Sequence, residues 1–166
     1  EYIRRALRLE KYATTETRSP EELFQMADDA VRWYKEVFGD DYYMELMRHE
    51  VTDPTISANR DTYPVQKAVE PYLIELARKY DVKLICSNDA HFLNKDDADA
   101  HEILLCLSTG KKLTDPHMQY SKQEWLKTRE EMNEIFSDIP EALSNTIEIL
   151  DKVETYDLDS APIMPF

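Results

Sequence analysis

The chain has 166 residues and a net charge of −14, with 34 acidic against 20 basic residues. Such an acidic balance repels nucleic-acid phosphates, so it argues against the chain binding nucleic acid by itself. Arg4, Arg5, Arg8 and Lys11 form a local basic group, which we interpret as a solvated helix face and not as a nucleic-acid patch. Hydrophobic residues make up 42%, which argues against disorder, and the presence of only two glycines excludes a glycine-rich phosphate loop. We therefore expect one globular, helix-rich α/β unit with a real core.

Residues 1–13 predict a helix, although the periodicity of their apolar residues is modest. A stronger signal follows in Ser19-Pro20-Glu21-Glu22, which is a capping box with proline at the first helical position. The helix that it starts should end at Gly39. Tyr42 to Arg48 then predicts a strand, in which we expect Glu45 to be ion-paired or at the solvent edge.

The next segment completes a β-α-β unit. Residues 50–63 look irregular, and a helix is predicted from about Pro64 to Tyr80, with a kink or a restart at Pro71. The strand 82–87 follows directly. Strand, helix and strand with short connections predict parallel pairing in a core of about residues 42–87.

A third helix is predicted from about Asp96 through Leu107, with Gly110 ending it. We interpret His101 on this helix as a packing or capping histidine. Residues 111–127 should form an extended connection, in which His117 is expected to be exposed.

The last part of the chain predicts two more helices. Thr128 with Glu131 forms another capping box, starting a helix through Phe136, and the next helix starts around residues 138–141. The tail 156–166 has no period and reads as a linker or docking segment.

Cys86 and Cys106 lie in apolar stretches, without the spacing of a zinc site or a disulfide framework. We expect two buried thiols in a reducing compartment, hence a cytoplasmic protein. No apolar run approaches the roughly 20 residues of a membrane span, and no signal peptide is evident. Because the sequence begins at Glu1 and ends at Phe166, we expect a piece of a longer protein.

The most informative stretch is the end of the second strand, Ser87-Asn88-Asp89-Ala90-His91-Phe92. If the extended conformation persists past Ser87, Asp89 and His91 project from the same side. An acid and a histidine at the C-terminal end of a parallel strand are typical of metal or catalytic sites in β/α barrels. His49 should lie at the same end. The alternative is an ordinary Asn-Asp turn.

Several stretches, taken in order, resemble bacterial DNA polymerase III alpha subunits. They are AVRWYKEVFG (30–39), YYMEL (42–46), SNDAHF (87–92), DAHEILLC (99–106), EEM (130–132), FSDIPEALSNT (136–146) and APIMPF (161–166). The likeness lies in the PHP (polymerase and histidinol phosphatase) domain of that family and runs roughly from residue 28 to 166, whereas residues 1–20 match nothing known to us.

The resemblance implies a fragment of a distorted parallel β/α (TIM-like) barrel followed by a helical segment. Residues 1–110 would be a partial PHP domain, and residues 111–166 a closing segment and linker toward the palm. The family's Asp-x-His motif supplies two metal ligands, which map onto Asp89 and His91. The metal would be Zn²⁺, Mn²⁺ or Fe. No ligand role transfers to Glu45 or His49.

The resemblance further implies a parent DNA-directed DNA polymerase, with the sliding clamp and the proofreading subunit as partners and DNA contacted by other domains. It allows a metal-dependent 3′–5′ exonuclease activity. The family's His-x-His motif and its Mg²⁺-binding palm aspartates are not in this sequence, so we expect the fragment alone to be inactive. The alternatives are a free-standing PHP phosphoesterase, which should end near residue 110, and a non-catalytic interaction module.

Overall fold

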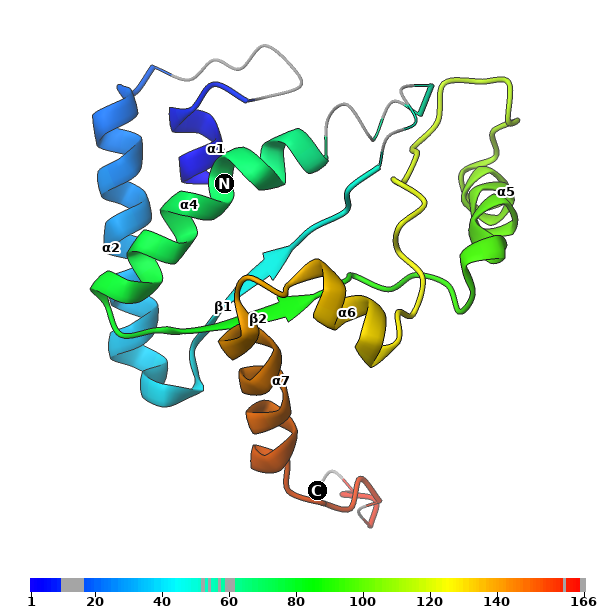
Figure 1. Cartoon of the computed structure of the whole chain (residues 1–166). Helices are drawn as coiled ribbons and strands as arrows, with labels where there is room; N and C mark the ends of the chain where they lie inside the picture. Colours follow the sequence, from blue (N-terminus) through cyan, green and yellow to red (C-terminus); the bar gives the residue numbers. More distant parts are fainter. Residues whose placement is uncertain are drawn as a thin grey trace.

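The computed structural model in Figure 1 describes residues 1–9, 17–51, 53, 55–56, 58, 62–159 and 161–164. Within these residues the chain forms six α-helices, two 3₁₀ turns and two strands. In chain order they are α1 (Tyr2–Ala6), α2 (Pro20–Phe38), η1 (Gly39–Asp41), β1 (Tyr43–Met47), α4 (Tyr63–Lys79), β2 (Lys83–Ser87), η2 (Lys95–Asp97), α5 (Ala98–Thr109), α6 (Arg129–Ile135) and α7 (Pro140–Lys152). The expected helix-rich α/β class is confirmed.

The two strands form a parallel sheet, in which Met44 lies opposite Leu84 and α4 makes the crossover. Along β1, Met44 and Leu46 are buried, whereas Glu45 between them is exposed. This alternation follows from the period of two in a strand, with one face toward the core. The β-α-β unit and the solvent-facing Glu45 are both as predicted.

Local signals set the ends of α2. The Ser19 hydroxyl accepts from the Glu22 N–H at 3.2 Å, and the Glu22 carboxylate accepts from the Ser19 N–H at 2.7 Å. Gly39 ends the helix with a positive φ of 56°. The predicted restart at Pro71 is not seen, because α4 continues through this residue. Packing of Leu73 and Ala77 against the strands offsets the backbone hydrogen bond that proline lacks.

The α6–α7 corner completes the same core. Phe136, Ile139 and Ala142 are buried with the strand residues in one hydrophobic cluster. On α7, the Asn145 side chain donates to the Leu84 carbonyl of β2 at 2.8 Å. The helix thus covers the outer edge of β2, whereas no described residue pairs along the outer edge of β1.

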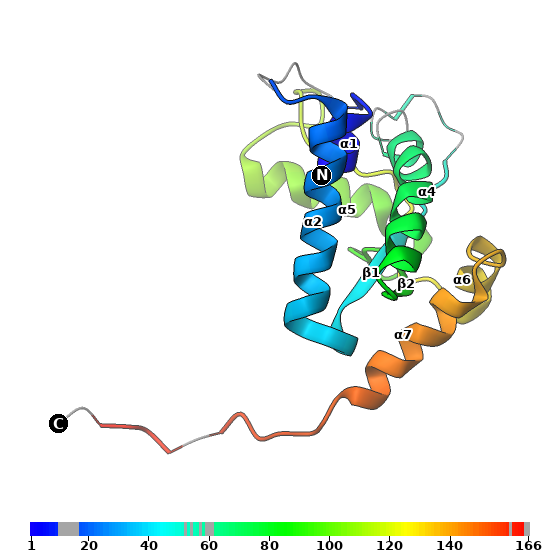
Figure 2. The same cartoon turned by 90° about the vertical axis from the view of Figure 1, so that its left-hand side faces the viewer.

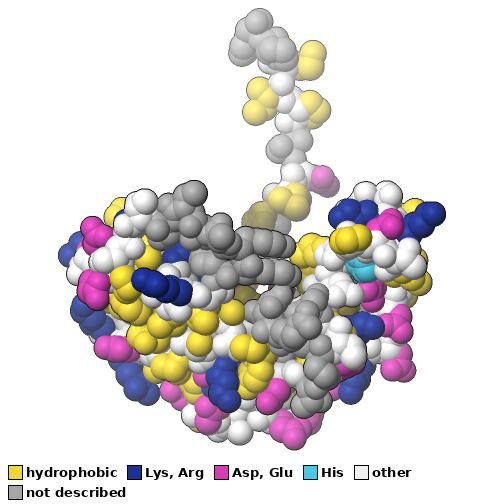
Figure 3. Space-filling view, turned by 90° about the horizontal axis from the view of Figure 1, so that it is seen from above, with side chains coloured by type: hydrophobic (Ala, Val, Ile, Leu, Met, Phe, Trp, Pro, Cys, Tyr) yellow, Lys and Arg dark blue, Asp and Glu magenta, His cyan; other side chains and the backbone are white. Residues whose placement is uncertain are grey.

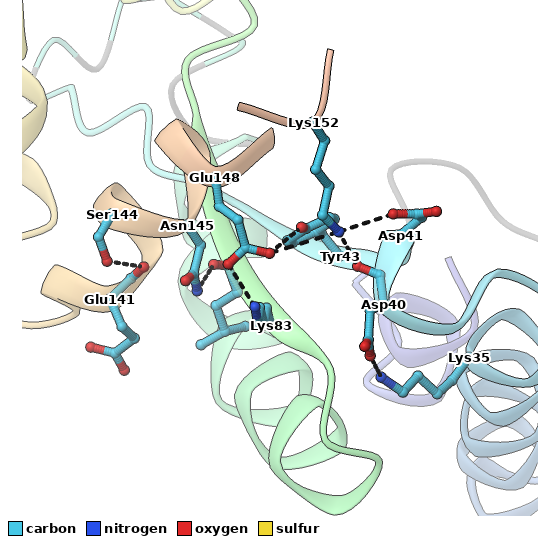
Figure 4. Close-up of polar contacts among 11 residues, drawn as sticks. Lys35, Asp40, Asp41, Tyr43, Lys83, Glu141, Ser144, Asn145, Glu148 and Lys152 are labelled. Carbon is cyan, nitrogen blue, oxygen red and sulfur yellow. Dashed lines mark hydrogen bonds and ion pairs between the residues drawn. The ribbon is translucent and has the colours of Figure 1, made fainter. Parts of the chain in front are cut away.

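A polar cluster joins α7 to the first residues of both strands (Figure 4). The Glu148 carboxylate accepts from the Tyr43 hydroxyl at 2.7 Å and pairs with Lys83 at 2.6 Å. Lys152 pairs with Asp41 at 2.9 Å, and contact with Tyr43 and Asp41 raises the pKa of Lys152. These contacts hold the C-terminal end of α7 beside η1.

Beyond α7, the described tail residues have no regular structure and run away from the body of the molecule (Figure 2). Tyr156, Leu158 and Ile163 are exposed there. Among the described residues, no helix has both the length and the apolar character needed to cross a membrane.

Arg48, just after β1, joins three parts of the chain. Its guanidinium donates to both carboxylate oxygens of Glu70 on α4, at 2.8 and 2.6 Å. It also donates to both oxygens of Asp138, at 2.6 and 2.9 Å, and to the Ile135 carbonyl at 2.9 Å. All five N–H groups are therefore used, and Glu70 and then Asp138 raise the pKa of Arg48. The same group lies over the Phe136 ring, 4.9 Å from its centroid.

We expect Arg48→Met to lower the free energy of unfolding by about 3 kcal/mol, because the half-buried Glu70 carboxylate loses its partner. Urea unfolding of the chain measures the change. Arg32→Met is the matched control, because Arg32 is exposed and its ion pair with half-exposed Asp29 is screened by solvent, so this variant should cost less than about 0.5 kcal/mol. Equal losses in the two variants would contradict the central role of Arg48.

Candidate metal site

The chain turns sharply after β2. The strand ends at Ser87, and Asp89 has a left-handed backbone with φ 47°. The prediction that an extended backbone aligns Asp89 and His91 is therefore wrong. The turn itself brings them together, with Asp89 Oδ2 at 3.3 Å from His91 Nε2. Aspartate tolerates this conformation better than most residues do, because its short polar side chain can bond locally.

The spacing of these two atoms suits a shared metal ion. Two ligands about 2.0 Å from one tetrahedral ion lie about 3.3 Å apart. The Asp89 side chain is 57% exposed and that of His91 32%, so an ion could reach both. No group of three or more His, Cys, Asp or Glu residues suited to a metal occurs in the described part of the chain. The donors fit two positions of a coordination sphere, and the others would come from elsewhere.

Asn88 anchors the turn from the inside. Its side-chain amide donates to the Gln123 carbonyl at 2.8 Å and to the Trp125 carbonyl at 2.7 Å. The end of β2 is therefore tied to a loop 35 residues further along the chain. Asparagine at this position has a structural role that the Asn-Asp turn pattern alone does not reveal.

The loop opposite the turn is fixed by a buried acid. Glu124 is 2% exposed, and its carboxylate accepts from the Ser121 N–H at 3.0 Å, the Ser121 hydroxyl at 2.5 Å and the Gln123 N–H at 2.9 Å. Three donors satisfy this carboxylate. The Glu124 carbonyl in turn accepts from the His91 N–H at 2.7 Å. Sequence reasoning missed this pair, although Ser-x-x-Glu at 121–124 is a recognisable pattern.

His49 lies at the same end of the sheet, as predicted, and it is buried. Its Nε2–H donates to the Asn88 carbonyl at 3.0 Å, and its Nδ1 accepts from the Gln66 amide at 3.0 Å. The Gln66 side-chain oxygen accepts from the His49 backbone N–H at 2.9 Å. Both ring nitrogens are engaged, so His49 supports the site and has no free lone pair for a metal.

Aromatic rings surround the His91 imidazole. Its centroid lies 4.5 Å from that of Tyr120 and 5.6 Å from that of His101. His101 also packs on Phe92, with centroids 5.3 Å apart. This packing limits the rotation of His91. The interpretation of His101 as a packing residue is confirmed.

The prediction of an exposed His117 is wrong, because its side chain is only 6% exposed. The loop folds back on α5, where the imidazole donates to the Asp115 carbonyl at 2.7 Å and to the Glu102 carboxylate at 2.8 Å. The Asp115 carbonyl and Glu102 raise the pKa of His117, and His117 lowers the pKa of Glu102. Only a protonated imidazole donates from both nitrogens.

Lys127 lies at the end of the same loop. Its Nζ sits 3.4 Å above the centre of the Trp125 ring and donates to the Gln123 carbonyl. Burial lowers the pKa of Lys127 to about 8. This amine therefore loses its charge in the mildly alkaline range.

Curated proteins named DNA polymerase III subunit alpha are similar to this chain. That of Campylobacter jejuni is 38% identical over 146 residues, which cover 87% of the chain and 11% of the relative. That of Borreliella burgdorferi is 35% identical over 145 residues, covering 86% and 12%. That of Escherichia coli strain K12 is 37% identical over 129 residues, covering 75% and 10%. The chain thus spans about a tenth of the length of these relatives. No family model matches it.

We expect Asn88→Ala to lower the free energy of unfolding by about 2 kcal/mol, because the Trp125 carbonyl loses its side-chain donor and the Gln123 carbonyl keeps only the bond from Lys127. Asn133→Ala, at an exposed position of α6, is the matched control and should stay within about 0.5 kcal/mol of the wild type. Chemical denaturation at neutral pH compares the two. If both variants unfold like the wild type, Asn88 does not hold the loop.

The raised pKa of His117 predicts a pH-dependent stability. Its contribution is complete below the unfolded-state pKa of about 6.5 and is lost as pH rises through the higher folded-state value. The lowered pKa of Glu102 sets the acid limit, because that contribution is lost as pH falls through the folded value.

Between about pH 6 and about pH 8.5, the urea midpoint of the wild type should therefore fall more than the midpoint of His117→Gln. The variant lacks the imidazolium, so the part of the decrease due to His117 disappears. An identical decrease in both proteins would show that the His117 contacts do not form in solution.

Proposed function

Since the chain belongs, as a segment, to the family of DNA polymerase III alpha subunits, we propose that it is the PHP region of a longer replicative DNA polymerase. Template-directed nucleotide addition and its Mg²⁺ ions then belong to a palm outside this chain. The supporting observation is the combination of 35–38% identity over most of the chain with an Asp-x-His turn at the end of a parallel strand.

We propose that β1 and β2 are two strands of a parallel β/α barrel, with residues 1–110 as its partial PHP domain and residues 111–166 as its closing segment and linker. Two features support this proposal: the strands are parallel, and α4 makes the crossover between them. The packing of α7 on β2 speaks against a free-standing phosphoesterase ending near residue 110.

Asp89 and His91 are proposed as two ligands of a divalent metal, Zn²⁺, Mn²⁺ or Fe, in the parent protein. The carboxylate supplies negative charge, and the imidazole presents Nε2 toward it at 3.3 Å. Asn88 and Glu124 hold the backbone on either side of the turn. When bound, such an ion supplies a Lewis acid and an activated water for phosphodiester hydrolysis, the chemistry of a 3′–5′ exonuclease.

A structural and partner-binding role is the second candidate. It is favoured by the donor count, because the described residues offer two clustered donors and not a full set. In this role the region supports contacts of the parent protein with the sliding clamp and the proofreading subunit, while DNA is bound by other domains. Both candidates place the parent protein in the cytoplasm.

The test is the metal content and nuclease rate of full-length Asp89→Asn and His91→Ala proteins. We expect both quantities to fall by about tenfold or more, because Asp89→Asn replaces a charged carboxylate by a neutral amide and His91→Ala removes the imidazole. Asp151→Asn, at an exposed position of α7, is the matched control. Primer extension on the same samples reports whether the polymerase is folded and active. Unchanged metal content and nuclease rate in both variants would leave the structural role.

A further inference from the structure

The outward side of α5 is an apolar stripe. Ile103, Leu104 and Leu107 are 53%, 60% and 75% exposed, and Ala100 is exposed with them. The spacing 100, 103, 104 and 107 places these residues on one side of the helix, within an arc of about 100°. We refer to these four residues as the α5 stripe.

The opposite side of α5 already has its neighbours. His101 packs on Phe92 and Tyr120, Glu102 bonds to His117, and Cys106 is buried. Figure 1 shows the helix set apart from the other helices, at the end of two long connections. Apolar residues thus lie on two sides of α5, and one of these two sides is uncovered here.

The lack of charge in the α5 stripe indicates a permanent interface and not a transient one. The stripe holds no charged residue, although 33% of the chain is charged. Figure 3 shows hydrophobic side chains beside charged ones at the surface of the lobe that carries this helix, so the uncharged area is confined to part of that surface. Permanent interfaces resemble a protein core and exclude charge, whereas transient ones are about as polar as the remaining surface.

We propose that the α5 stripe is an internal interface, covered by an apolar helix from another part of the same polypeptide. The proposal rests on the proposed function, in which this chain is a segment of a longer polymerase. The relatives are about ten times longer, so most of the parent protein lies outside the segment. A covalently linked segment has a high local concentration, and a stripe with i, i+3, i+4, i+7 spacing fits a second helix.

The experiment measures thiol reactivity in the purified full-length protein, without other subunits. Leu104→Cys lies in the α5 stripe, and Ser108→Cys is the control, because Ser108 is exposed on the same helix but outside the stripe. Maleimide labelling is followed at each cysteine by peptide mass spectrometry. At nanomolar protein, we expect Leu104→Cys to react at least about tenfold more slowly than Ser108→Cys, because a covered thiol reacts only after local opening.

Ala100→Cys repeats the test with a smaller change of volume, in case Leu104→Cys does not fold. Equal rates at the stripe and control positions would overturn the proposal. So would protection that appears only at high protein concentration, which indicates a second copy, or only after another subunit is added. Thiol labelling reports on this interface alone, whereas metal content and nuclease rate report on the proposed function. A failure of one proposal is therefore distinguished from a failure of the other.

Discussion

The structure depends on one cation placed between two acids. Arg48 brings together the end of β1, the middle of α4 through Glu70, and the α6–α7 corner through Asp138. A planar guanidinium with two bidentate partners has little freedom, so it sets the angles between these elements as well as their contact. The buried Phe136 ring beneath it makes the ionic and the apolar parts of the core one unit.

Next to Arg48, His49 starts a series of polar contacts that reaches the candidate site. It bonds to the Asn88 carbonyl, and the Asn88 amide holds the loop at 123–125. That loop returns to the turn through the Glu124 carbonyl and the His91 N–H. The backbone of the candidate site is therefore supported from within, while the Asp89 and His91 side chains stay 57% and 32% exposed.

Local patterns predicted local structure well. The Ser19 capping box, the Gly39 terminus and the β-α-β order all follow from spacing along the sequence, and all are observed. The contacts of His117 and the partners of Arg48 depend on residues that are distant in sequence, so no spacing indicates them. The turn at Asp89 is of a third kind. The two predicted ligands do lie together, as expected. The cause is the left-handed backbone of Asp89, whereas the prediction assumed the alternation of side chains along a strand.

The placement of α7 makes the two edges of the small sheet different. The Asn145 amide donates to the Leu84 carbonyl, which a third strand would need as an acceptor. The Thr146 hydroxyl lies 3.5 Å from the Cys86 carbonyl. A further strand, including the next strand of a barrel, can pair with β2 only where these α7 contacts open, so in this segment α7 protects that edge against aggregation. At the outer edge of β1, by contrast, no described residue pairs with the strand. Within the described residues, therefore, α7 shields one edge of the two-stranded sheet and leaves the other edge open to a further strand.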